Sequence, residues 1–441
     1  MREAGGYREI WVLSWPVMLA QMLVSAVSLV DIAMVGRLGP HAVAAVGYAS
    51  QFFNLAQAVL FAIGTACVAL MARSIGAGDR PRARVALAAS LIVALGTSLL
   101  FLAIILAAPR WYLRGLGAEP DVIDAAIPYL VLVLLATVFL AVSITLESAL
   151  RADRNTRVPM LIAVVVTTVK IGLNALLIFG GLGLPRLGLV GAGLATIVAQ
   201  ALGLAIYASI LATSKRDSPL ALVRGDFRAA RDELREVVRI SLPGVGERLA
   251  MNLALLAYFR VLSGYGTVAI AAYTVGVRIL AFSWIPGTGF GVAASALVGQ
   301  SLGAQRPEEA MRVGWRATRM AIAIAVPLGA LCALAREPLG RLFTDDPATI
   351  EALGPFLLCL ALSQPFLQAH FALGGAHRGA GDTWTPFIAA TVGNWVLRTP
   401  VAFFLAFVLH TQVIWVWYAL TIDHLARAAW LTWSFRRGRI R

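Results

Sequence analysis

Long uncharged stretches constrain this sequence more than any other feature. Residues 42–72, 85–109, 125–146, 187–214 and 279–305 carry no charge, and each stretch exceeds the roughly 20 residues that a membrane-spanning helix needs. Of the 441 residues, 59% are hydrophobic and only 14% are charged. A water-soluble fold could not bury that much apolar surface. The pattern therefore predicts an all-α integral membrane protein.

About twelve spans are predicted, near residues 10–36, 43–72, 85–109, 122–150, 158–180, 188–213, 236–262, 269–300, 314–335, 349–376, 386–409 and 412–434. The formal charge of +14 would also suit a nucleic-acid-binding protein. Most of the 37 Lys and Arg residues, however, fall on the side of the N-terminus and in the tail. An excess of Lys and Arg marks the cytoplasmic face. We therefore expect both termini in the cytoplasm and no nucleic-acid partner.

The sequence contains an internal repeat. An offset of 227 residues aligns residues 8–77 with residues 235–304 without a gap. The identities fall on uncommon residues, such as Pro16 with Pro243, and shared prolines are harder to obtain by chance than shared leucines. The same offset aligns Arg151 with Arg378 in the motifs LRADRNTRVP and HRGAGDTWTP, which lie between the fourth and fifth spans of each copy. The repeat thus covers nearly the whole of each half.

This repeat sets the expected domain organisation. Each copy holds six spans, an even number, so the copies are parallel repeats related by an axis along the membrane normal. We expect two pseudo-symmetric six-helix bundles, at residues 1–213 and 236–441, joined by a charged cytoplasmic linker at residues 214–235. Two bundles that rock would open a cleft to either side of the membrane, which is the geometry of alternating access. A duplicated scaffold without a substrate is the alternative, but it would not need the intramembrane charges described below.

Several motifs resemble one transporter family. They are LVDIAMVGRLG, which contains Asp31, then ARSIGAGDRPRA with its repeat partner VGQSLGAQRPEEA, LNALLIFGGLGLPRLGLVGAGLAT, and RGAGDTWTP. Together they resemble the multidrug and toxic compound extrusion (MATE) family, and in particular its NorM-like bacterial branch, over essentially the full chain.

The resemblance implies a twelve-helix exporter that expels organic cations and other amphiphilic compounds in exchange for inward H+ or Na+. It also implies a multi-pass protein of the bacterial inner membrane. The expected partners are a small amphiphilic or cationic substrate and membrane lipid, and we expect a monomer. We expect no enzymatic activity and no cofactor beyond H+ or Na+ as the coupling ion.

Ionisable side chains within the spans are candidates for a site, because each costs several kcal/mol unless it is paired or hydrated. The four acids are Asp31, Glu147, Glu247 and Asp423, and the six bases are Lys170, Arg248, Arg260, Arg278, Arg398 and Arg427. Asp423 and Arg427 are four residues apart on the last helix, which predicts a structural ion pair. Glu147 lies beside Arg151 near the cytoplasmic end of its span, and a structural role is favoured there too.

Asp31 is the first candidate for the coupling ion. It lies about twenty residues into the first span and matches the first-helix carboxylate that binds the coupling ion in the family. A carboxylate can hold a proton, a Na+ or a cationic drug, but hardly two of them together, so competition for it would give antiport. Na+ is accordingly one possible ligand of Asp31. A structural ion pair is the alternative role.

Lys170 and Asn174 lie one turn apart on one face of the fifth span. The family more often carries Asn and then Asn or Asp, so Asn174 fits its pattern and Lys170 departs from it. If Lys170 approaches Asp31, its charge could occupy the place of a bound cation. One hypothesis is that Lys170 itself exchanges the proton.

In the second copy Glu247 follows Pro243 by one helical turn. Much of the family places its acid one turn further on, where this chain has Met251. We keep two readings of Glu247, a coupling-ion site and an ion-pair partner of Arg248 or Arg278. Further candidates for lining a substrate cleft are Gln21, Asn54, Tyr258, Arg278, Trp284 and Asn394, although interhelical hydrogen bonds and packing explain such residues equally well.

Rival functions follow from the same features. A lipid-linked oligosaccharide flippase of the same superfamily would use a basic cleft to hold a diphosphate, and six intramembrane bases against four acids leave this open. An intramembrane enzyme would need clustered His, Cys or acidic motifs. The cysteines Cys67, Cys332 and Cys359 and the five histidines form no such cluster. Solid runs of bulky residues disfavour a passive channel.

Overall fold

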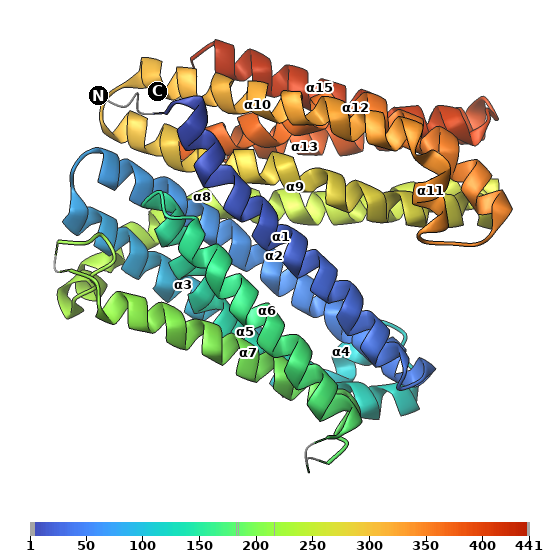
Figure 1. Cartoon of the computed structure of the whole chain (residues 1–441), viewed down its shortest axis with the longest axis horizontal. Coiled ribbons are helices and arrows are strands. Elements are labelled where there is room, and N and C mark those ends of the chain that lie inside the picture. The colour runs from blue at the N-terminus through green and yellow to red at the C-terminus, as the bar shows by residue number, and fades with distance from the viewer. Residues whose placement is uncertain (1–4, 182, 184, 216, 439–441) are drawn as a thin grey trace. The chain divides into compact units, whose positions relative to one another are not determined.

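The computed structural model describes residues 5–181, 183, 185–215 and 217–438, and its elements are helices (Figure 1). The chain divides into two compact units. The N-terminal unit comprises residues 19–241, and the C-terminal unit comprises residues 1–18 together with residues 242–441. Two helices contribute to both units, α1 (Tyr7–Gly36) and α8 (Arg224–Leu262).

The N-terminal unit contains α2 (Pro40–Gly76), α3 (Arg80–Ala107), the short α4 (Pro109–Gly115), α5 (Pro120–Ala152), α6 (Arg157–Phe179) and α7 (Gly188–Ala212). Here α5 packs against α2, α3 and α7, and α6 packs on α7. Proline opens α2, α3, α4 and α5 at their first turn, where its missing N–H costs no hydrogen bond.

The C-terminal unit repeats this arrangement with α9 (Thr267–Gly303), α10 (Pro307–Leu334), the short α11 (Arg336–Arg341), α12 (Pro347–Gly379) and α15 (Val413–Arg436). A 3-10 turn, η1 (Ser263–Tyr265), precedes α9. One interrupted helix lies between α12 and α15, formed by α13 (Trp384–Val392), η2 (Gly393–Arg398), α14 (Thr399–Phe403) and η3 (Phe404–Val408), of which η2 and η3 are π-helical. In this unit α12 packs against α9, α10 and α15, and these helices run side by side (Figure 1).

The helices agree with the predicted spans. Among the described residues, ten helical segments are long and apolar enough to cross a membrane. The remaining two predicted spans correspond to α8 and α15, which are 39 and 24 residues long but more polar. The first half of α8 is charged, and α15 carries Asp423, His424 and Arg427 near its middle. The all-α, twelve-helix membrane fold with two related halves is thereby confirmed.

The segment expected to be a linker, residues 214–235, is helical from Arg224 onward. The Asp226 carboxylate accepts a hydrogen bond from the Val223 backbone N–H at 2.9 Å, which caps the start of α8. Ion pairs join this first part of α8 to α3, namely Arg84 with Asp226 at 3.4 Å and Arg82 with Glu233 at 3.3 Å. One face of the same stretch is apolar and packs within the N-terminal unit, because Ala230 and Val237 are fully buried there.

Glycines allow α9 and α12 to pack at very short range. A Cβ atom added to Gly375 would lie 2.1 Å from the carbonyl oxygen of Gly291, and one added to Gly379 would lie 2.2 Å from that of Ser295. Small residues at such crossings bring helix backbones together, which is a main source of helix association in membranes. The crossing also fixes the part of α12 that carries His370 and Arg378.

We predict that Gly375→Val lowers the apparent melting temperature of the purified protein in detergent, because the added methyl groups would overlap the backbone of α9. Overpacking of this kind costs about 1–3 kcal/mol. Gly354→Val is the matched control on the same helix, since a Cβ atom at Gly354 meets nothing within 4 Å. Equal melting temperatures for the two variants would show that the close α9–α12 crossing is not needed for stability.

Candidate functional site

The N-terminal unit brings together three of the four residues predicted for coupling-ion sites. Lys170 donates a hydrogen bond from Nζ to Asp31 Oδ2 and forms an ion pair with it. Asn174 donates from Nδ2 to the other carboxylate oxygen, Oδ1, at 2.6 Å. Asp31 comes from α1, while Lys170 and Asn174 lie one turn apart on α6. Both oxygens of Asp31 are therefore occupied by donors of the same chain.

This cluster is electrically neutral and partly shielded. The side chains of Asp31 and Lys170 are 24% and 23% exposed, and Asn174 is buried. The Asn174 amide oxygen, Oδ1, is buried without a hydrogen-bond partner among the described residues.

Glu147 lies away from this cluster. It forms an ion pair with Arg151 one turn later on α5, as the favoured structural interpretation predicted. This pair lies at the end of α5, close to the loop that precedes α6.

In the C-terminal unit Glu247 is held by an arginine that the sequence interpretation did not consider. Arg378 Nη2 on α12 donates to both carboxylate oxygens of Glu247, at 2.8 and 2.9 Å. The partners expected from sequence, Arg248 and Arg278, do not make this ion pair. Arg248 follows Glu247 directly and Arg278 is exposed on α9, whereas the α9–α12 crossing presents Arg378. The repeat could have identified Arg378 from the sequence. It aligns Arg378 with Arg151, which forms an ion pair with Glu147 in the first copy.

Asp423 and Arg427 form the predicted ion pair along α15. Arg427 donates from Nε and Nη2 to the two oxygens of Asp423, and the side chains are 6% and 0% exposed for Arg427 and Asp423. Gly393 of η2 lies against this pair, because a Cβ atom there would be 2.1 Å from Asp423 Oδ1. Any larger residue at position 393 would displace the ion pair, so its glycine is required by packing.

Arg398, at the end of η2, has no carboxylate partner among the described residues. Its Nη2 donates to the Tyr273 hydroxyl at 2.8 Å, and its guanidinium carbon lies 4.3 Å from the ring centre of Tyr258. Tyr258 is fully buried and donates its own hydroxyl to the carbonyl of Val416 at 2.8 Å. Tyr258 is thus a packed support for Arg398, and its ring is closed to solvent.

The other residues predicted to line a cleft are dispersed within the two units. Gln21, Asn54 and Arg278 are exposed. Trp284 is half-buried, with its indole N–H lacking an acceptor, and Asn394 is buried with both amide atoms unpartnered among the described residues.

The loop formed by the RGAGDTWTP motif has a clear structural role. Asp382 lies between α12 and α13, where it accepts a hydrogen bond from the Thr385 backbone N–H at 2.9 Å and lies 3.1 Å from His377 Nδ1. Burial would raise the pKa of Asp382, but the hydrogen bonds from His377 and Thr385 outweigh it and hold this pKa below its ordinary value. The motif therefore fixes the turn that leads into α13.

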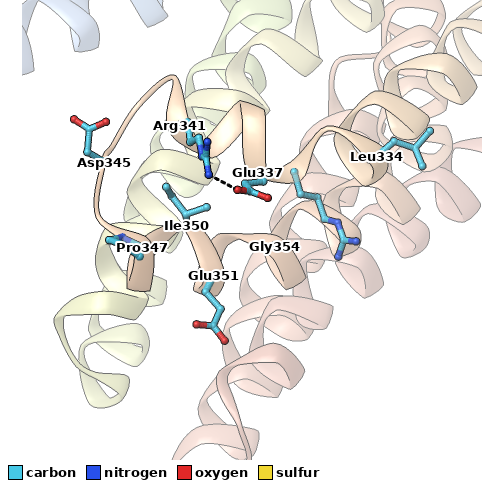
Figure 2. Close-up of a pocket in the computed structure, with 9 residues that line it drawn as sticks. Leu334, Glu337, Arg341, Asp345, Pro347, Ile350, Glu351 and Gly354 are labelled. Carbon is cyan, nitrogen blue, oxygen red and sulfur yellow. Dashed lines mark hydrogen bonds and ion pairs between the residues drawn. The ribbon is translucent and has the colours of Figure 1, made fainter.

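A cavity of about 740 Å³ lies where α10, α11 and the start of α12 meet (Figure 2). Its charged lining residues are Arg336, Glu337, Arg341, Asp345 and Glu351. Arg341 points toward Glu337 and binds it at 2.5 Å (Figure 2). None of the predicted site residues lines this cavity, and the described residues hold no group of three or more His, Cys, Asp or Glu side chains suited to a metal ion.

Comparisons with known proteins agree with the repeat and the fold. The MatE family model matches residues 16–176 and again residues 243–404. A relative in Bradyrhizobium diazoefficiens, named "Probable multidrug resistance protein NorM", is 31% identical over 96% of this chain and 92% of its own length. A relative of the same name in Thermotoga maritima is 27% identical over 98% of this chain and 92% of its own length.

Solved structures show the same fold. A MATE protein in complex with MaL6 has a TM-score of 0.90 at 24% identity, covering 100% of this chain and 98% of that one. A transporter of the MOP superfamily from Pyrococcus furiosus, described as having a binding pocket of reverse polarity, has a TM-score of 0.90 at 23% identity, covering 98% of this chain and 96% of that one. With both repeats matched by the family model, this chain belongs to the MATE family, and its relatives include proteins named NorM.

Proposed function

We propose that this protein is an H+-coupled antiporter that exports organic cations, drugs and other amphiphilic compounds across the bacterial inner membrane by alternating access. The observation that carries the proposal is the Asp31–Lys170–Asn174 cluster within the spans of a MATE chain. The distribution of Lys and Arg supports a topology with both termini in the cytoplasm. The relatives' names support a small-molecule substrate.

The geometry of the cluster favours H+ over Na+ as the coupling ion. A Na+ ion bound at Asp31 would lie beside the ammonium of Lys170, and the two positive charges would repel each other. The ammonium of Lys170 occupies the position that a metal cation would take beside the carboxylate. A proton needs no such space, because it can bind at Asp31 while Lys170 moves away.

Proton binding also explains how export would be coupled. The cluster carries no net charge while Asp31 is ionised and Lys170 is protonated. When a proton binds, the carboxylate becomes neutral and the cluster gains one positive charge, which in a low-dielectric span repels a cationic substrate strongly. Inward proton movement would then drive release of the substrate. A lipid-linked oligosaccharide flippase is the less favoured function, because the named relatives are multidrug resistance proteins.

We predict that Asp31→Asn abolishes gradient-driven efflux, because an amide cannot carry the proton. The measurement is efflux of a fluorescent organic cation from proteoliposomes under an imposed pH gradient and, separately, under a Na+ gradient. Wild-type protein should respond to the pH gradient, and the variant should lose at least about tenfold in rate, which is the scale of one lost charge-assisted interaction.

Asp345→Asn is the matched control, since Asp345 lines the cavity near α11 and is remote in sequence from the cluster. It should transport as wild type does. Transport by wild type that follows only the Na+ gradient would refute proton coupling, and absence of transport under either gradient would turn attention to lipid flipping.

We further predict that Lys170→Gln allows Na+ to bind at Asp31 and weakens coupling to H+. Without the ammonium, Asp31 has an oxygen free to bind Na+, so Na+ should protect the variant against thermal unfolding while leaving wild type unaffected. The H+-driven efflux of the variant should fall. Removing one member of a fully buried ion pair costs about 3–5 kcal/mol, and the loss should be smaller here because the pair is partly exposed. The neutral double variant Asp31→Asn/Lys170→Gln should recover much of this stability.

Lys215→Gln serves as the control for the loss of a lysine, because Lys215 is exposed beyond the end of α7. Normal pH-driven coupling in Lys170→Gln would rule out a part for Lys170 in proton exchange.

A further inference from the structure

The two repeats place a cation at equivalent positions but give it different surroundings. The offset of 227 residues aligns Asp31 with Tyr258. On the fifth span of the repeat, the π-helical segment η2 lies between the aligned Pro386 and Arg398. A π-helical turn holds one extra residue, which shifts the offset to 228 and aligns Lys170 with Arg398.

The contacts within each unit agree with this alignment. In the N-terminal unit the fifth-span cation Lys170 binds Asp31 of the first span. In the C-terminal unit the fifth-span cation Arg398 lies over the ring of Tyr258 on α8. The second repeat thus keeps the cation but replaces its carboxylate by a tyrosine ring. An aromatic face attracts a cation but leaves its charge in place.

Among the described residues of the C-terminal unit, no acid takes over this role. Asp423 lies on α15, which packs on η2, but both its oxygens are bound by Arg427. The formal charges of Asp423, Arg427 and Arg398 sum to one positive charge. Glu247 is bound in the same way by Arg378. An uncompensated cation inside a spanning segment costs several kcal/mol, so the region favours binding of an anion.

Arg398 also has unused hydrogen-bonding capacity. A guanidinium has five N–H donors, and the one hydrogen bond found among the described residues goes from Nη2 to Tyr273. Nε is buried without an acceptor, and Nη1, which is not buried, also lacks one. The planar edge formed by such N–H groups matches the two oxygens of a carboxylate or phosphate.

Neighbouring polar groups have unmet capacity as well. Asn394 lies one turn before Arg398 and is 1% exposed, with both amide atoms unpartnered among the described residues. His424 lies on α15, which packs on η2. It is 6% exposed, and neither ring nitrogen has a hydrogen-bond partner among the described residues. Buried polar atoms normally have partners, so this group is suited to a polar ligand.

We propose that Arg398 binds the oxyanion of an amphiphilic compound, a carboxylate or a phosphate, with Asn394 and His424 as supporting polar groups. The ligand is amphiphilic because Arg398 lies within a spanning segment. The inference rests on the proposed transport function and extends its substrates from organic cations to organic anions. The same chemistry would also bind the phosphate of an anionic lipid.

The test measures binding of dansyl-undecanoic acid to the full chain in nanodiscs of phosphatidylcholine, by energy transfer from tryptophan. Its methyl ester is the matched neutral probe. Wild type should bind the acid at least about tenfold more tightly than the ester, and Arg398→Gln should lose this preference. Arg398→Lys, which keeps the charge but loses the planar fork, should be intermediate.

Arg260→Gln is the control for loss of an arginine in the same unit, because Arg260 is exposed and donates to Ser263. It should keep the preference for the acid. Arg398→Gln removes an uncompensated charge, so it should unfold at no lower temperature than wild type. If that variant fails to fold, Arg398→Lys still tests the site. Equal binding of acid and ester by wild type, or an unchanged preference in Arg398→Gln, would overturn the proposal.

Two further measurements are needed. One distinguishes a lipid phosphate from a transported anion as the ligand, and the other tests the proposed antiport independently of the anion site. If phosphatidylglycerol in the nanodiscs weakens binding of the acid tenfold, the lipid phosphate competes for the site and is its ligand. If binding is unchanged, the ligand is a transported anion. Both outcomes support an oxyanion site. Failure of wild type to export cations under a pH gradient would count against the proposed antiport alone, because the binding measurement needs no gradient.

Discussion

The cost of an unpaired charge inside an apolar bundle governs how this protein is built. Apolar surroundings hydrate a charge poorly, so each ionisable group must find an opposite charge or remain at a cost of several kcal/mol. All four acids within the spans meet this demand with an arginine or lysine of the same unit. The pairs are Asp31 with Lys170, Glu147 with Arg151, Glu247 with Arg378, and Asp423 with Arg427. The positions of the helices that carry them are constrained accordingly.

The repeat meets this demand in different ways in its two copies. Arg151 and Arg378 are equivalent by sequence, yet Arg151 pairs with Glu147 on its own helix while Arg378 pairs with Glu247 from α8. The residue of α12 that aligns with Glu147 is Gly374, and a Cβ atom there would lie 3.4 Å from Arg378 Nη1. Loss of the acid on α12 is therefore compensated by an acid on a neighbouring helix. The repeat retains the arginine and changes the source of its partner.

These differences explain which features were predictable from the sequence. Lengths of apolar stretches are a local property, so most span ends were predicted to within a few residues. The larger differences are at the start of α10, which begins at Pro307 rather than near residue 314, and at the start of α8. There, residues 224–235 are charged on one face but bury Ala230 on the other, and charge alone suggested a linker. The pairing of Glu247 with Arg378 depends on how far each helix is rotated about its axis. That rotation is set by close packing such as Gly291 against Gly375, which composition and spacing do not reveal.

The contrast between Lys170 and Arg398 bears on how such a transporter could handle ions and substrates of opposite sign. The N-terminal cluster is neutral and becomes positive when it binds a proton, whereas the region around Arg398 is positive and becomes neutral when it binds an anion. A single carboxylate shared by proton and substrate would force the two to compete. With the two proposed responses located in different repeats, proton uptake and anion binding would each satisfy a local charge requirement. In the second repeat Tyr258 stands at the position of Asp31, and it leaves Arg398 without a carboxylate partner among the described residues, which is the condition for this second kind of site.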